Sequence, residues 1–284
     1  MPVSGRTGAF FAARRGTRRA FAESPTCAKF SGLGRQFPPP QDFGAVHADG
    51  IVSSDIVGYS TDSLTSGKFN MGGITFTTVG GDDIDLNDVT FNNLTKGDEA
   101  DNADKIQVWN PGTSGYTTYY FYNAEGDEDN WGWVDENWEV PDATLAVGTA
   151  FWYKAKPGSD KSMTVSGALE SADDVTVNLT GGKFNMVISP FPSAIDLNNT
   201  KTVVITNYTP GDEADNADKV QVWNPATSGY TTYYYYNAEG DEDNWGWVDE
   251  NWELPDASLA AGTAFWYKAK TGTGKSIKFI NPTK

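Results

Sequence analysis

Short runs of apolar and aromatic residues, separated by glycine, proline, asparagine and aspartate, follow one another along the chain from residue 51 onward. Runs this short, bounded by turn residues, are typical of β-strands, and no stretch shows the apolar spacing of an amphipathic helix. In the first copy of the pattern the expected strands are Ile51–Tyr59, Phe69–Thr78, Val89–Leu94, Lys105–Trp109, Tyr116–Tyr122, Ala150–Lys156 and Ser162–Val165. The pattern predicts an all-β protein of antiparallel β-sandwiches, Ig-like or jelly-roll-like.

One long segment of the chain occurs twice. Gly97–Glu139 returns at Gly211–Glu253 with three substitutions, at Ile106/Val220, Gly112/Ala226 and Phe121/Tyr235. The repeat is too long for a propeller blade or a solenoid unit, so each copy is expected to be a whole domain. The sequence therefore predicts a disordered leader or misassigned start at 1–50, a first β-sandwich at 51–167 and a second at 168–284.

The segment Trp109–Gly115 is predicted to be the turn between two strands. Proline disfavours helix at Asn110, and Gly112 and Gly115 are expected to supply positive φ angles. The following strand, Tyr116–Tyr122, carries aromatic residues at both odd and even positions. We therefore expect it to lie inside a sheet that is covered on both faces.

Charge is distributed unevenly along the chain. The formal net charge is −17, and because the first 48 residues carry +5, residues 49–284 carry −22. Such an acidic body is not expected to bind nucleic acid through the phosphate backbone. A single cysteine excludes an intrachain disulfide framework, and no apolar stretch is long enough to predict a transmembrane segment.

The leader has two interpretations. Thr17–Phe21 contains an arginine pair, as a twin-arginine export signal does, but the apolar segment that should follow is missing. The small residues of Val46–Ala48 would suit signal-peptidase cleavage, again without the apolar region. The leader is thus either a start that does not belong to the folded protein or an export signal that is not intact.

Part of the second copy resembles a family of modules. Gly182–Asp196, GKFNMVISPFPSAID, is similar to the segment GWNLIGNPYPxxID of β-rich modules in secreted and surface proteins of Gram-negative bacteria. Val220–Asn224 and Ala261–Tyr267 resemble the later VW(N/D)P and PGxAFW segments of those modules, whereas Gly72–Ile84 of the first copy lacks both prolines. The resemblance implies an exported or cell-surface β-module of uncharacterised biochemical role, with no active site.

The two copies contain neither histidine nor cysteine. This excludes a Ser-His or Cys-His nucleophile and a histidine-based zinc site from residues 51–284. A glycoside hydrolase needs only two facing carboxylates, and Glu125, Glu128, Glu136 and Glu139 are available. These four glutamates share one short polar segment, which favours a solvated acidic surface and predicts that the protein is not an enzyme.

The acidic segments partly match a calcium-binding loop. Asp127, Asp129 and Asp135 stand at the first, third and ninth positions of an EF-hand-like pattern, with Trp138 where a bidentate glutamate is required. Asp241, Asp243 and Asp249 repeat the pattern in the second copy, and Asp98, Asp101 and Asp104 form a further acidic group. Calcium is therefore a candidate cofactor, and a charged solubilising loop is the alternative.

Three tryptophans follow each acidic segment. They are Trp131, Trp133 and Trp138 in the first copy and Trp245, Trp247 and Trp252 in the second. In an extended chain, residues two apart project to the same side, so Trp131 and Trp133 could form a sugar-stacking platform. The alternative is that these rings fold back and cap the open end of the sandwich, because burying an indole stabilises a fold.

These observations favour a non-catalytic, exported structural or adhesive protein. Two near-identical copies offer two equivalent surfaces to a polysaccharide, to a cell-surface component or to other copies of the chain. A carbohydrate-binding protein that uses the loop tryptophans is the first alternative, and a carboxylate-dependent glycoside hydrolase is the second. The expected location is extracellular or at the cell surface.

Overall fold

The computed structural model describes residues 56–126, 131–135, 137, 143–240, 245–251 and 257–284. These residues form twenty β-strands and one 3-10 turn, Leu86–Asp88, and belong to one compact unit. The all-β prediction is confirmed. Within the described ranges there is no helix of the length and apolarity needed to span a bilayer.

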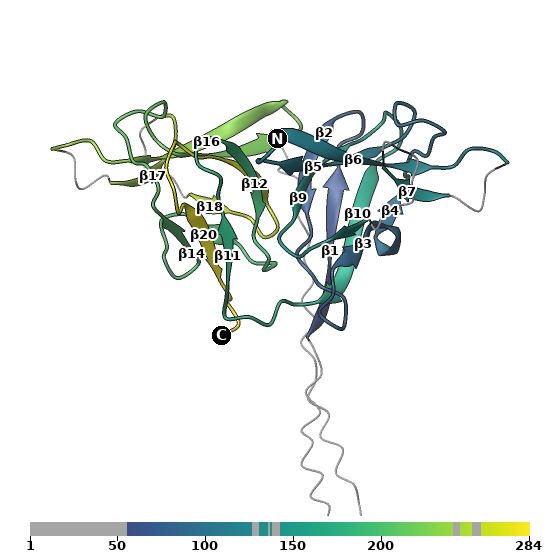
Figure 1. Ribbon diagram of the computed structural model, residues 1–284, viewed down its shortest axis with the longest axis horizontal. Helices are drawn as coiled ribbons and strands as arrows, with labels where there is room; N and C mark the ends of the chain where they lie inside the picture. The colour runs from purple at the N-terminus through teal and green to yellow at the C-terminus, as the bar shows by residue number, and fades with distance from the viewer. Residues whose placement is uncertain (1–55, 127–130, 136, 138–142, 241–244, 252–256) are drawn as a thin grey trace, which may run out of the picture. The chain divides into compact units, whose positions relative to one another are not determined.

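The first half of the unit, residues 56–168, contains two sheets and a short ladder (Figure 1). Every strand pairing is antiparallel. The five-stranded sheet has the order β2 (Phe69–Gly73), β9 (Ala150–Lys154), β5 (Lys105–Asn110), β6 (Gly115–Tyr122) and β7 (Gly132–Val134). The three-stranded sheet has the order β1 (Val57–Leu64), β10 (Lys161–Ala168) and β4 (Thr90–Asn92), and β3 (Ile84–Asp85) pairs with β8 (Thr144–Leu145).

The second half, residues 174–284, repeats this topology. Its five-stranded sheet has the order β12 (Phe184–Ile188), β19 (Ala264–Lys268), β15 (Lys219–Asn224), β16 (Gly229–Tyr236) and β17 (Gly246–Val248). Its three-stranded sheet has the order β11 (Asp174–Asn178), β20 (Ser276–Ile280) and β14 (Val203–Thr206), and β13 (Ile195–Asp196) pairs with β18 (Ser258–Leu259). The same sequence pattern has thus produced the same strand order twice.

The core of each half lies between its two larger sheets. In the first half, Ile106 and Phe151 of the five-stranded sheet pack with Met163 and Val165 of the three-stranded sheet. Successive side chains of a strand point to opposite faces, so the alternate residues of β5 and β9 lie on the outer face. Phe265, Tyr267, Ile277 and Phe279 belong to a separate, equivalent core in the second half. This arrangement is sandwich-like in both halves.

The predicted turn between β5 and β6 is present, but its backbone differs from the prediction. Ser114, with φ of 53°, takes the left-handed conformation, and neither Gly112 nor Gly115 does. The Asn110 carboxamide oxygen accepts hydrogen bonds from the backbone N–H groups of Gly112 (2.9 Å) and Thr113 (3.3 Å). The asparagine side chain therefore holds the turn, and glycine is not required at position 112.

The two halves make reciprocal hydrogen bonds. Trp109 donates its indole N–H to the carbonyl oxygen of Phe184 (2.7 Å), and Trp223 donates to that of Phe69 (2.7 Å). Trp223 is the equivalent of Trp109, and Phe69 is the equivalent of Phe184, so the two bonds are the same contact made in both directions. A contact of this kind is isologous, because both halves use the same patch of surface.

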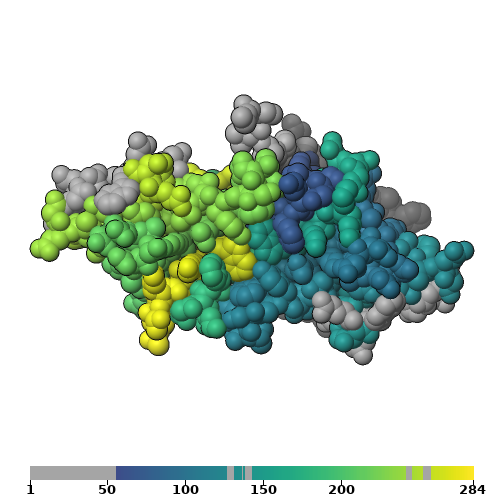
Figure 2. All heavy atoms as spheres, turned by 90° about the horizontal axis from the view of Figure 1, so that it is seen from above, coloured from purple at the N-terminus to yellow at the C-terminus, as the bar shows by residue number. Residues whose placement is uncertain are grey.

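Aromatic rings fill the same contact. Trp109 meets Trp266 edge to face at 5.5 Å between ring centroids, and Trp152 meets Trp223 in the same way at 5.5 Å. Ala150, Ile188 and Ala264 form a small buried cluster that draws on both halves. Figure 2 shows atoms of the two halves in direct contact. The outer faces of the two five-stranded sheets are thus partly buried against one another.

Candidate functional site

The tryptophans of the acidic segments have different surroundings. Trp133 lies in β7 opposite Phe121 and is buried, with 1% of its surface exposed. Trp131 precedes the strand and is 46% exposed. The two indoles therefore do not form a shared platform, because β7 directs Trp133 into the core. Trp138 lies outside the described residues.

The second half shows the same division. Trp245 is 46% exposed and Trp247 is 2% exposed, whereas Trp252 lies outside the described residues. The indole N–H of Trp131 donates to the carbonyl oxygen of Ala124 (2.9 Å), and that of Trp245 donates to Ala238 (3.0 Å). Each half therefore holds one indole in a fixed position with part of its surface open to solvent.

The calcium prediction falls partly on residues that the structure does not describe, namely Asp127, Asp129, Asp241 and Asp243. Asp135 accepts hydrogen bonds from the backbone and side-chain nitrogens of Asn137, and Asp249 does the same with Asn251. Among the described residues, no group of three acidic, histidine or cysteine side chains is arranged to hold a metal ion.

The third member of the other acidic group, Asp104, has a different role. Its carboxylate is fully buried and forms an ion pair with the buried Lys161 at 2.9 Å. The carboxylate also accepts hydrogen bonds from the Tyr153 hydroxyl (2.7 Å) and from the backbone N–H groups of Thr95 (2.8 Å) and Lys156 (2.6 Å). Asp104 is therefore fully occupied by protein donors and is not available to a cation.

The lysine of this network is equally well bonded. Besides Asp104, the Lys161 ammonium donates to the carbonyl oxygen of Asn93 (2.6 Å) and to Thr95 Oγ1 (2.7 Å). An ammonium has three protons, and each has an acceptor here. Lys161 therefore makes three hydrogen bonds within the protein. Burial, with the nearby Asp104 charge, raises the pKa of the Tyr153 hydroxyl far above its ordinary value.

The second half contains the same network. Asp218 pairs with Lys275 at 2.8 Å and accepts from the Tyr267 hydroxyl at 2.8 Å. Neither ion pair was predicted from the sequence, although a signal was present. In β10, Lys161 lies on the same face as the core residues Met163 and Val165. Because side chains of a strand alternate between its two faces, the sequence places the Lys161 side chain in the core. A buried lysine requires an acidic partner.

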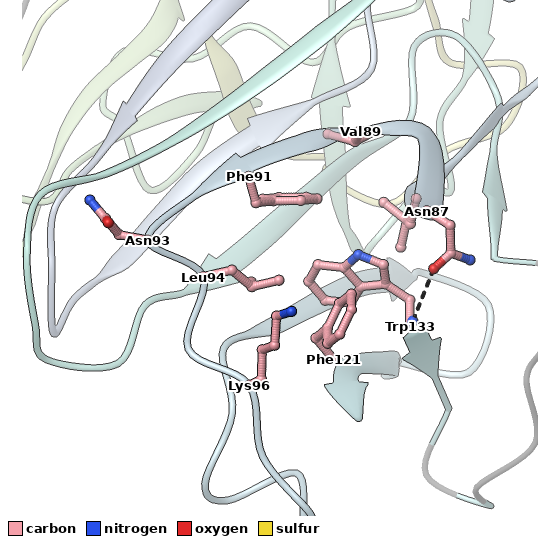
Figure 3. A pocket seen from close by; sticks show the side chains of 9 residues that line it. Asn87, Val89, Phe91, Asn93, Leu94, Lys96, Phe121 and Trp133 are labelled. Atoms are coloured by element: carbon pink, nitrogen blue, oxygen red, sulfur yellow. Dashed lines mark hydrogen bonds between the residues drawn. The ribbon is translucent and has the colours of Figure 1, made fainter. Parts of the chain in front are cut away.

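The first half also contains an open pocket of about 410 Å³ (Figure 3). Apolar side chains line most of it, with polar groups at its edge. The lining residues are Leu86, Asn87, Val89, Phe91, Asn93, Leu94, Lys96, Phe121 and Trp133. Of the glutamates considered for hydrolysis, Glu125 is exposed, and Glu128, Glu136 and Glu139 lie outside the described residues.

The fold and these sites define a chain of two joined antiparallel β-sandwiches with duplicated exposed indoles. Comparison of the chain with protein-family models, with curated proteins and with solved structures found no match.

Proposed function

We propose that the protein is a non-catalytic structural or adhesive β-module protein that acts outside the cell or at its surface. The observation that carries this proposal is the presentation of Trp131 and Trp245 at the same exposure, 46%, and with the same anchoring hydrogen bond. A half-exposed indole leaves apolar surface in water, and the fold loses the free energy that burying this surface would supply. Two indoles with the same exposure therefore favour a role in contacting a partner at two equivalent places.

Duplication adds strength to such a contact. The reciprocal hydrogen bonds and edge-to-face rings join the two halves, so the two indoles belong to one folded unit. A repetitive partner that engages one indole meets the second at high effective concentration. The partner of this proposal is a cell-surface component, a polysaccharide or further copies of the chain.

Self-association is tested by light scattering of the full chain over a wide concentration range. We expect the apparent mass to rise with concentration in the wild type and to stay at the monomer value in the double variant Trp131→Ala, Trp245→Ala. Each single variant should weaken association only partly. Val79→Ala, which alters an even more exposed apolar side chain elsewhere, is the control. A monomer at all concentrations, with no binding to cell-surface preparations, would refute the adhesive proposal.

Carbohydrate binding is the second candidate. It is favoured by the hydrogen bonds that fix the Trp131 and Trp245 indoles, because a preorganised ring stacks on a sugar without losing conformational freedom. We expect soluble polysaccharides to quench tryptophan fluorescence in the wild type and not in the double variant. A panel of neutral and acidic glycans without effect would exclude this candidate and leave the structural one in place.

A further inference from the structure

The second half carries a tyrosine ring at the position where Leu94 lines the pocket of the first half. Asn93 and Thr95 correspond to Asn207 and Thr209, because each pair supplies the same two acceptors to the buried lysine. Leu94 therefore corresponds to Tyr208, and Lys96 to Pro210. The Tyr208 ring lies against Tyr235 with 4.3 Å between centroids.

The position of that tyrosine indicates what the open pocket can hold. Tyr235 is the counterpart of Phe121, which lines the pocket of the first half. With Leu94 in place of tyrosine, the first half supplies no ring of its own to lie against Phe121 at this position. The Tyr208 ring thus shows that an aromatic ring fits against the residue equivalent to Phe121.

Trp133 contributes a buried ring to the wall of the pocket, with 1% of its surface exposed. Figure 3 shows the indole between Phe91 and Phe121, among the side chains that line the pocket.

Lys96 carries the one charge among the described residues of the lining. Its ammonium lies over the Phe121 ring, 4.7 Å from the centroid. Of the two asparagines in the lining, Asn87 accepts from the Trp133 backbone N–H, and Asn93 donates through its NH2 group to the carbonyl oxygen of Asp160. The charged group that the described lining offers to a ligand is therefore the Lys96 ammonium, a donor.

We propose that this pocket binds a small aromatic carboxylate. The ring lies against Phe121, as Tyr208 lies against Tyr235 in the second half, and the carboxylate accepts a hydrogen bond from the Lys96 ammonium. A carboxylate suits this ammonium better than a neutral acceptor does, because a hydrogen bond between two charged groups is stronger. The acidic body repels anions at long range, but salt at about 0.15 M screens charges more than about 8 Å away.

The test measures the binding of phenylacetate to the full chain by ligand-observed NMR and by calorimetry, at about 0.15 M salt. We expect saturable binding to one site per chain. The neutral analogue phenylacetamide should bind about fivefold more weakly, which is the upper end for an ion pair with an exposed lysine. Lys96→Gln should remove that difference and leave the amide's affinity unchanged.

Two further variants place residues of one half at the equivalent positions of the other. Leu94→Tyr copies the residue that the second half already accommodates, so it should fold and reduce phenylacetate affinity at least tenfold. Tyr208→Leu combined with Pro210→Lys should open an equivalent pocket in the second half and raise the stoichiometry to two sites per chain. Thermal unfolding of each variant confirms that it is folded.

Three results would overturn the proposal. They are the absence of binding by the wild type at millimolar phenylacetate, full binding by a folded Leu94→Tyr variant, and equal affinity for the acid and the amide. None of these results bears on the exposed indoles, so the adhesive proposal is tested separately.

Discussion

Replacing Lys161 by methionine leaves a buried carboxylate without its counterion. Asp104 and Lys161 have 0% and 1% of their side-chain surface exposed, so water cannot replace the lost contact. Removing one partner of a buried ion pair costs about 3 to 5 kcal/mol. Asp104 keeps the donors of Tyr153, Thr95 and Lys156, so we expect Lys161→Met to fall near the lower end, at about 3 kcal/mol.

The opposite change, Asp104→Asn, should cost more, about 4 to 5 kcal/mol. The NH2 group of the amide would face N–H and O–H donors from which the carboxylate now accepts hydrogen bonds. The Lys161 ammonium would be left with two neutral acceptors. The double variant Asp104→Leu, Lys161→Met removes both charges and should cost less than the sum of the single changes.

Urea unfolding at pH 7, followed by tryptophan fluorescence, measures these differences. Lys105→Met is the matched control, because Lys105 pairs at 2.8 Å with the exposed Asp101, and we expect its midpoint to be unchanged. Lys275→Met tests the same argument in the second half. A loss below about 1 kcal/mol for Lys161→Met, or a milder effect for Asp104→Asn, would refute the reasoning.

Four other predictions follow from the described contacts. Because burial raises the pKa of Tyr153 above 10, its stabilising effect is complete below pH 10 and is lost as the pH rises beyond it. Tyr153→Phe should therefore reduce the fall in unfolding free energy above pH 10 by about 1.4 kcal/mol per pH unit, measured by denaturation at several pH values. Gly73→Ala should lower stability by about 1 to 3 kcal/mol, since a Cβ would stand 2.5 Å from the Thr149 carbonyl oxygen, whereas Gly80→Ala has room; thermal unfolding compares the two. Trp109→Ala should cost about 2 kcal/mol in urea unfolding and speed proteolysis, because the ring and its hydrogen bond join the halves. Calcium, if the acidic segments bind it, should raise the melting temperature and a chelator should reverse the rise; no shift would exclude it.

Much of the strand pattern could be predicted from the sequence. Runs such as Lys105–Trp109 and Tyr116–Tyr122 match β5 and β6 closely, because turn residues mark their ends and side-chain alternation marks their faces. The short strands β3, β7 and β8 were missed, because two or three residues carry no measurable periodicity. The φ prediction at the turn was wrong, although Ala226 at the position of Gly112 already argued against a need for glycine there.

The candidate sites were less predictable. Spacing alone placed Trp131 and Trp133 on one side, but the strand begins at Gly132, so the two residues do not share one extended segment. Asp104 looked like its acidic neighbours in the sequence, and only the tertiary fold brings Lys161 to it across 57 residues. Leu94 and Lys96 line the open pocket, and their difference from Tyr208 and Pro210 could be noticed only once the two halves were aligned on their structures.

Because the halves are joined in one chain, their isologous contact does not depend on protein concentration. A face that fits its own copy would, in separate half-length chains, form a pair whose population depends on protein concentration. Residues 169–173 connect the halves here, so their encounter is unimolecular and insensitive to concentration. The pairing should therefore survive dilution, under which separate subunits would come apart.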